Sequence, residues 1–67
     1  MRYLYHKCIF RVVAGSAEGK SQMEYLTSAC TWTPKRELAV QFDMLRQQER
    51  DAAGRMMEKV GGGQLED

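Results

Sequence analysis

The sequence predicts an α+β fold, in which a two-stranded antiparallel β-hairpin is followed by one long C-terminal α-helix. Three observations support this prediction. Residues 2–32 are rich in Tyr, Ile, Val, Phe, Thr and Trp, which favour strands. Residues 35–53 contain neither Gly nor Pro and are dominated by good helix formers. Between the two regions, Pro34 suits the first turn of a helix and Thr33 can act as its N-cap.

The first strand is predicted over residues 2–14. Alternation along this strand separates two apolar sets: one face carries Leu4, His6, Cys8, Phe10 and Val12, and the other carries Tyr3, Tyr5, Lys7, Ile9, Arg11 and Val13. One helix can cover only one of these faces. We therefore expect a partner, most simply a second copy related by a two-fold axis, on the face with Tyr3, Tyr5, Ile9 and Val13.

A Gly-containing loop at residues 15–20 is predicted to lead into a return strand over residues 22–32. An alternative remains open at this point. Ser21 and Glu24 form a capping-box pattern, and Met23, Leu26 and Cys30 have helical spacing, which would give the order strand, helix, helix. The threonines and the tryptophan of residues 27–33 favour the extended conformation and therefore the hairpin.

The C-terminal helix is predicted from Pro34 to about Lys59. Its apolar stripe consists of Leu38, Phe42, Leu45, Ala52, Ala53, Met56 and Val60. Glu49 falls on the same stripe, where an unpaired carboxylate would be costly, so we expect a bend or a departure from the sheet nearby. Val40 and Met44 lie on the opposite side and are predicted to contact a partner.

Residues 1–60 are predicted to form a single small domain, and residues 61–67 a flexible Gly-rich tail, because consecutive glycines lose much backbone entropy on ordering. A 67-residue chain buries only about 60% of its unfolded surface. Homodimerisation is the support that we expect for such a marginal core.

Ten Lys and Arg residues against nine Asp and Glu give a net charge of +1, which excludes a strong general attraction for polyanions. A local basic flank is nevertheless predicted on the helix, where it could contact an acidic protein or nucleic-acid phosphates: Lys35, Arg36, Arg46 and Arg50. The chain has no apolar run of about 20 residues and no secretion signal. These features predict a cytoplasmic protein without membrane contact, with Cys8 and Cys30 as reduced thiols.

Three motifs contain residue types that could support chemistry. Residues 14–21 fit a loose phosphate-binding loop, in which Lys20 and Ser21 would contact phosphate and Mg²⁺, but so short a chain cannot supply the parallel sheet that such sites need. The other two motifs use the only histidine and the two cysteines: a zinc site, which matches no standard ligand spacing, and a Cys-His catalytic pair, which lacks a third group. We therefore expect no catalytic residues, no metal and no cofactor.

The function predicted from these features is that of a small non-enzymatic interaction protein, which acts as an inhibitor, adaptor or assembly factor by binding a larger protein partner. The alternative is a dimeric nucleic-acid-binding regulator that uses the basic flank. A weaker alternative is nucleotide or phosphate binding through residues 14–21.

Overall fold

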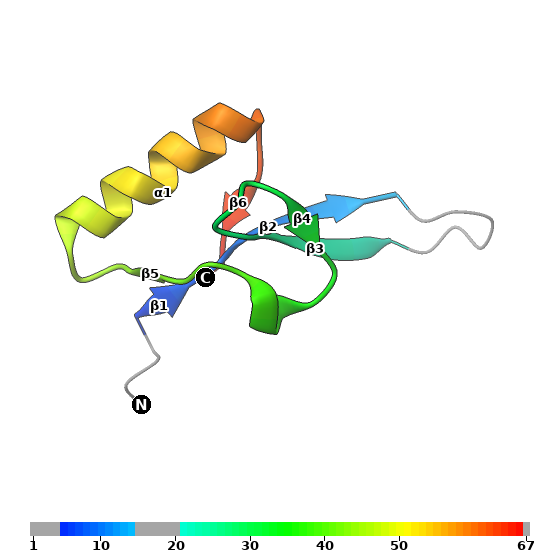
Figure 1. Cartoon of the computed structure of the whole chain (residues 1–67), viewed down its shortest axis with the longest axis horizontal. Coiled ribbons are helices and arrows are strands. Elements are labelled where there is room, and N and C mark those ends of the chain that lie inside the picture. The colour runs from blue at the N-terminus through cyan, green and yellow to red at the C-terminus, as the bar shows by residue number, and fades with distance from the viewer. Residues whose placement is uncertain (1–4, 15–20, 67) are drawn as a thin grey trace.

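The computed structural model describes residues 5–14 and 21–66 of the chain and shows an α+β fold (Figure 1). The elements follow in the order β1 (His6–Lys7), β2 (Ile9–Val13), β3 (Gln22–Leu26), β4 (Trp32–Thr33), a 3-10 helix η1 (Arg36–Leu38), β5 (Phe42–Asp43), α1 (Gln47–Val60) and β6 (Gln64–Leu65). The predicted fold class is confirmed in outline, because an antiparallel hairpin precedes a C-terminal helix.

The hairpin of β2 and β3 forms the centre of a four-stranded antiparallel sheet with the strand order β4-β3-β2-β6. Its register pairs Phe10 with Tyr25 and Val12 with Met23. A second, two-stranded sheet joins β1 to β5. Residues 22–26 are therefore extended, as predicted, and the strand-helix-helix alternative is wrong.

The return segment is not one continuous strand, because a tight turn separates β3 from β4. Thr27 and Thr31 close this turn: the Thr27 N–H donates to the Thr31 carbonyl at 2.8 Å, and their hydroxyl oxygens lie 2.7 Å apart. Cys30 occupies the left-handed region with φ 64°. A three-residue hairpin loop usually needs such a residue, and glycine fits it best.

Replacing Cys30 with glycine is therefore expected to raise the free energy of unfolding by about 1 kcal/mol, because glycine adopts this conformation without the penalty that a Cβ brings. Urea unfolding of the two proteins measures the change. Ala29→Gly, in the same turn, is the matched control and should be neutral or slightly destabilising. An unchanged or lower stability of Cys30→Gly would contradict the turn geometry.

The predicted helix from Pro34 to Lys59 is wrong in its first half. The backbone there bonds to distant segments of the chain: the Val40 N–H donates to the Leu26 carbonyl at 3.1 Å, and the Met44 N–H donates to the Tyr5 carbonyl at 2.8 Å. Phe42, between them, is paired with Lys7 in the β1-β5 sheet. These long-range contacts outweigh the helix propensity of the segment, which is only a few tenths of a kcal/mol per residue.

The helix α1 begins after Arg46, and this start accounts for Glu49. Glu49 lies in the first turn of α1, where its carboxylate accepts the Asp43 N–H at 3.3 Å. A negative charge is also favourable at a helix N-terminus. The expected bend around a buried lone carboxylate is therefore unnecessary, since the side chain has a backbone partner.

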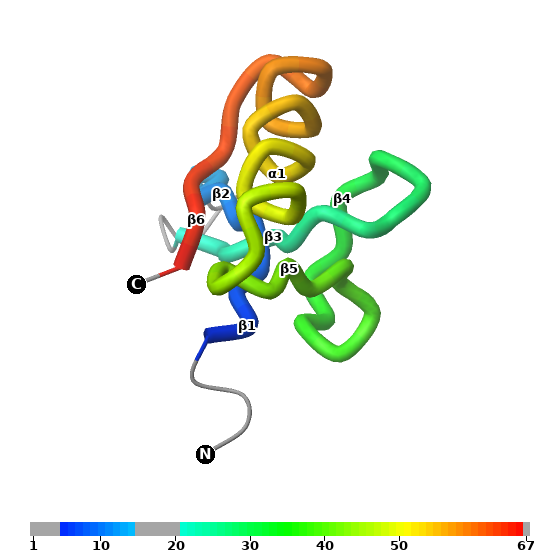
Figure 2. The backbone as a smooth tube through the Cα atoms, turned by 90° about the vertical axis from the view of Figure 1, so that its left-hand side faces the viewer, coloured from blue at the N-terminus to red at the C-terminus, as the bar shows by residue number. Residues whose placement is uncertain are grey.

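At its other end, α1 stops at Gly61, which has the left-handed φ of 78°. The Gly61 N–H donates to the Glu58 carbonyl and the Gly62 N–H to the Met57 carbonyl, the bonding pattern of a Schellman motif. The chain then reverses and returns along the sheet, as the backbone trace shows (Figure 2).

The prediction of a separate flexible tail needs correction, because Gln64 and Leu65 form strand β6 at the edge of the sheet. Gly63 makes this possible. A Cβ built there would lie 2.9 Å from Ile9 Cγ2 and 3.1 Å from the Trp32 ring, so only glycine allows so close an approach. The contacts that β6 makes offset the entropy that the glycines lose.

The core lies between the sheet and α1, and its buried members come from four elements: Ile9, Leu26, Phe42 and Ala53. Figures 1 and 2 show α1 on one side of the sheet and η1 on the other. The helix face toward the core carries Ala52, Ala53, Met56, Met57 and Val60. Within residues 5–14 and 21–66, no helix combines the length and hydropathy needed to cross a membrane.

Candidate functional site

An apolar strip lies on the side of the sheet away from α1. Phe10 pairs with Tyr25 and Val12 pairs with Met23, so the four side chains are neighbours. They project opposite to Ile9, because successive residues of a strand alternate between its two faces. Val12 is 60% exposed and Met23 44% exposed, while the two aromatic residues are half-buried. We call these four residues the open face.

The uncovered side of the hairpin is thus the opposite of the one predicted. Ile9 has no exposed surface and packs in the core beside Leu26 and Phe42, so its prediction as a partner contact is wrong. Strand alternation shows that two apolar faces exist but does not distinguish them. The position of α1 decides between them, since the helix covers the Ile9 side.

The other predicted interface residues are spread over different parts of the fold. Val40 and Met44 are half-buried against the chain's own core rather than on the outer side of a helix. Tyr5 is 50% exposed and Val13 is half-buried. Tyr3 lies outside the described residues.

Arg11 lies on the Ile9 side of the sheet, where the core meets solvent. The Arg11 guanidinium stacks over the Trp32 ring, with Cζ 4.3 Å from the ring centroid. The same guanidinium donates to Glu24, its cross-strand neighbour, at 2.7 Å. The aliphatic part of Arg11 and the indole of Trp32 therefore form the boundary of the core on the side of the hairpin loop.

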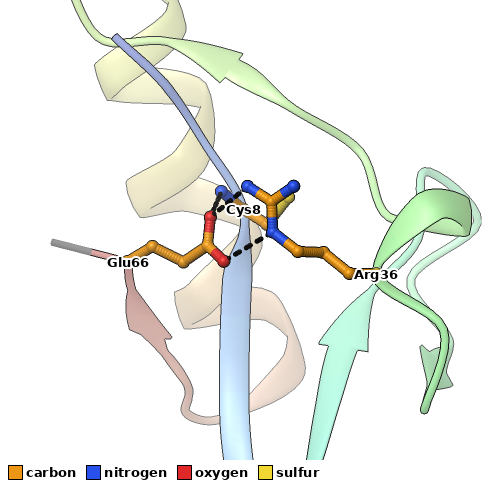
Figure 3. Close-up of polar contacts among 3 residues, drawn as sticks. All are labelled: Cys8, Arg36 and Glu66. Carbon is orange, nitrogen blue, oxygen red and sulfur yellow. Dashed lines mark hydrogen bonds and ion pairs between the residues drawn. The ribbon is translucent and has the colours of Figure 1, made fainter. Parts of the chain in front are cut away.

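The second feature is a polar cluster of Cys8, Arg36 and Glu66, which we call the Glu66 cluster (Figure 3). One Glu66 oxygen accepts the Cys8 N–H at 2.9 Å and Arg36 Nη2 at 2.7 Å, and the other accepts Arg36 Nε at 2.8 Å. The Glu66 N–H donates to the Cys8 carbonyl at 3.1 Å. The cluster thereby joins the β1-β2 junction, η1 and the end of β6.

Electrostatics in the Glu66 cluster favour the ion pair and a protonated thiol. Hydrogen bonds from Arg36 hold the pKa of Glu66 below its usual value, against the opposing effect of burial, and the Cys8 N–H adds to the lowering. Burial raises the pKa of the Cys8 thiol, and the Glu66 charge raises it further. Since the thiolate is the reactive form, Cys8 is a poor nucleophile here.

The lowered pKa of Glu66 predicts a loss of stability in acid. Its ionised form contributes stability that is fully present above the ordinary value of 4.5 and is lost as pH falls through the lower folded-state pKa. Glu66→Gln should therefore flatten the decline of the urea midpoint below about pH 4.5. Glu58→Gln, exposed on α1, is the control. Parallel profiles for wild type and Glu66→Gln would show that the ion pair adds no stability.

The four basic residues of the predicted flank do not share a helix. Lys35 and Arg36 lie at the start of η1, whereas Arg46 and Arg50 lie at the start of α1. These two helices are on opposite sides of the sheet (Figure 1). The predicted common flank is therefore wrong, because the segment that would have aligned these residues is not helical.

The arginines of this set also have partners within the chain. Arg36 binds Glu66, as described above. Arg46 lies 3.4 Å from the Asp43 carboxylate, and Arg50 donates to the Met44 carbonyl at 2.6 Å. Contacts to a phosphate would have to compete with these interactions.

The two cysteines of the candidate zinc site occupy separate places. Cys8 is buried at the β1-β2 junction, and Cys30 lies in the β3-β4 turn. Across the part of the chain that the structure describes, no three His, Cys, Asp or Glu side chains are placed to hold a metal ion. Most of the phosphate-loop pattern, residues 15–20, lies outside the described residues.

The chain matches no protein-family model, no curated protein and no solved structure. Its function therefore has to be inferred from the geometry of the open face and the Glu66 cluster.

Proposed function

We propose that the protein is a non-enzymatic interaction module that binds a larger protein partner through the open face. The observation that carries this proposal is the exposure of Val12 and Met23, at 60% and 44%, as a directly paired couple on one side of the sheet. Such a partner would remove the open face from water. Inhibitors, adaptors and assembly factors all act in this way.

The arrangement of the exposed residues supports the proposal more than their number does. Single exposed apolar side chains are normal on protein surfaces, whereas contiguous apolar patches are typical of contact sites. Phe10 and Tyr25 continue the strip as half-buried aromatic residues, a type enriched at interfaces. Met23 adds a flexible side chain that adapts to a partner's shape.

Apolar exposure on this side of the sheet is not confined to the strip. η1 lies on the same side (Figure 1), and its Leu38 is 58% exposed. Arg36, also in η1, has its charge balanced by Glu66. A partner with a largely apolar contact surface therefore fits better than a strongly acidic one.

Site-specific photo-crosslinking tests this proposal. A photoreactive residue at position 12 or 23 should give an adduct of one defined mass in an extract of the native cell. A photoreactive residue in place of Leu45, which is 65% exposed in the turn before α1, is the matched control and should give none. Val12→Lys should abolish the adduct from position 23 and leave the melting temperature unchanged, because Val12 is mostly solvated.

Two results would count against the open face as a binding site. Equal adducts from positions 12, 23 and 45 would indicate non-specific contact, and no adduct from any of them would leave the open face without a partner. An adduct of twice the chain mass would contradict a larger partner, because it would show that the open face contacts a second copy, as in the homodimer that the sequence predicts.

Nucleic-acid binding and nucleotide binding stay predictions. The first has weaker support now that Lys35 and Arg36 lie apart from Arg46 and Arg50. Salt dependence separates it from apolar docking, because phosphate contacts weaken steeply as salt rises. The second would be supported by a higher melting temperature in the presence of ATP or GTP.

A further inference from the structure

The strand β6 is a small element at the edge of the sheet. Within the described residues it pairs with β2 at Ile9 and Phe10 alone, so its removal would leave the other described strand pairs intact. The contacts that hold it are nevertheless specific. Gly63 fits against Ile9 and Trp32, Leu65 packs against the core, and Glu66 joins its cluster. The edge of β2 is thus a slot for an extended segment with a glycine, an apolar residue and an acid.

The hinge that carries β6 consists of three glycines in unusual conformations. Gly61, Gly62 and Gly63 have φ values of 78°, 154° and 105°, which fold the chain back from α1 onto its own sheet. Glycine adopts extended conformations just as readily. Gly62 can therefore change conformation at little cost in backbone energy, while Gly61 keeps the cap of α1 and Gly63 keeps its contacts with Ile9 and Trp32.

We propose that β6 exchanges between two copies of this chain, so that residues 63–66 of each copy occupy the slot of the other. Exchange re-forms between copies the contacts that β6 makes within one copy, and only the hinge conformation differs. This equivalence makes swapping of a terminal element a low-cost route to a dimer. The partner copy supplies Glu66 to the cluster and so completes it.

The short hinge restricts how the copies meet. Gly61 and Gly62 connect α1 to the exchanged segment and span about 7 Å, so the two β2 edges must lie side by side. The Glu66 N–H bonds to the Cys8 carbonyl, and by alternation the main-chain groups of Phe10 and Val12 also face this edge. Within the described residues, no strand pairs with this edge beyond Phe10. The Val12 N–H and C=O are therefore available to a second β2.

Charge reversal at the Glu66 cluster tests exchange directly. Arg36→Glu places two acids in the cluster, and Glu66→Arg places two bases there, so each variant alone should melt at a lower temperature than wild type. In an exchanged dimer of the two variants, both slots hold one acid and one base. Mixing them should therefore give a heterodimer by light scattering and a melting temperature above that of either sample. Unchanged mass and melting temperature after mixing two folded variants would overturn the proposal.

A hinge variant keeps the test decisive if the charge variants do not fold. Gly62→Val disfavours the closed hinge, in which Gly62 has φ 154° and an added Cβ meets nothing within 4 Å, but not an extended one, so the dimer-to-monomer ratio at fixed concentration should rise on the order of tenfold. Gly54→Ala, where an added Cβ meets nothing within 4 Å, is the control. A Gly62→Val protein that is monomeric, or unfolded, at every concentration would refute exchange. The charge and hinge variants leave Phe10, Val12, Met23 and Tyr25 unchanged, so their outcome does not depend on whether the open face binds a partner.

Discussion

Replacing Phe42 with alanine is expected to lower the free energy of unfolding by about 3 to 5 kcal/mol. Phe42 is only 4% exposed and packs with Ile9, Leu26 and Ala53. Its ring therefore fills the centre of a core with few other large members. A chain of 67 residues has a total stability on the order of 3 to 10 kcal/mol, so the variant should lose about a third of it or more and, at the lower end of this range, be unfolded near room temperature.

Urea unfolding followed by circular dichroism measures this loss. Two control variants set the scale: Met44→Ala, which removes a half-buried side chain at the margin of the core, and Leu45→Ala, which removes one that is 65% exposed. The losses should decrease in the order Phe42, Met44, Leu45. Equal losses for Phe42→Ala and Leu45→Ala would show that β5 does not face α1.

Replacing Gly63 with alanine is expected to lower the free energy of unfolding by about 3 kcal/mol, a large effect for a single methyl group. Two causes add. The φ of 105° is unfavourable for any residue with a Cβ, and that Cβ would lie 2.9 Å from Ile9 Cγ2 and 3.1 Å from the Trp32 ring. Either the core side chains shift or β6 leaves the sheet.

Thermal unfolding of Gly63→Ala and Gly54→Ala separates these causes from a general effect of the substitution. Gly54 lies inside α1 and an added Cβ there meets nothing within 4 Å, so Gly54→Ala should raise stability by about 1 kcal/mol. Opposite signs for the two variants are the expected result. If Gly63→Ala also stabilised the protein, the glycine run would be the flexible tail that composition suggests.

The strands of the hairpin were predictable because their signal is local. β-branched and aromatic residues fill Ile9–Val13, and loop residues follow them, so the strand could be recognised without knowledge of its neighbours. The break between β3 and β4 was not predictable in the same way. Cys30 in a left-handed conformation gives no sequence signal, since glycine or asparagine is the usual residue there.

The segment before α1 shows the limit of propensity. Residues 35–46 contain no helix breaker, yet Arg36–Leu38 forms a 3-10 turn and Phe42–Asp43 a strand. Burial of Phe42 and backbone bonds to Leu26 and Tyr5 decide this. Each of these contacts joins residues far apart in the sequence, so no pattern within a short segment of the sequence predicts it.

The candidate site shows the same division. Alternation predicts that the hairpin has two apolar faces and that one helix leaves one of them bare. It does not indicate which face the helix covers. The composition of residues 61–67 suggests mobility, whereas the contacts of Gly63 and Glu66 place the segment in the sheet.

The sequence by itself determined the fold class, the hairpin and the existence of an apolar face that one helix cannot cover, because periodicity and residue type act over a few neighbouring positions. Only the tertiary structure decided which face stays open, where the helix begins and how the three glycines return the chain to the sheet. These features depend on the free energy of contacts between distant segments, which exceeds the local preferences wherever side chains such as Ile9 and Phe42 become buried.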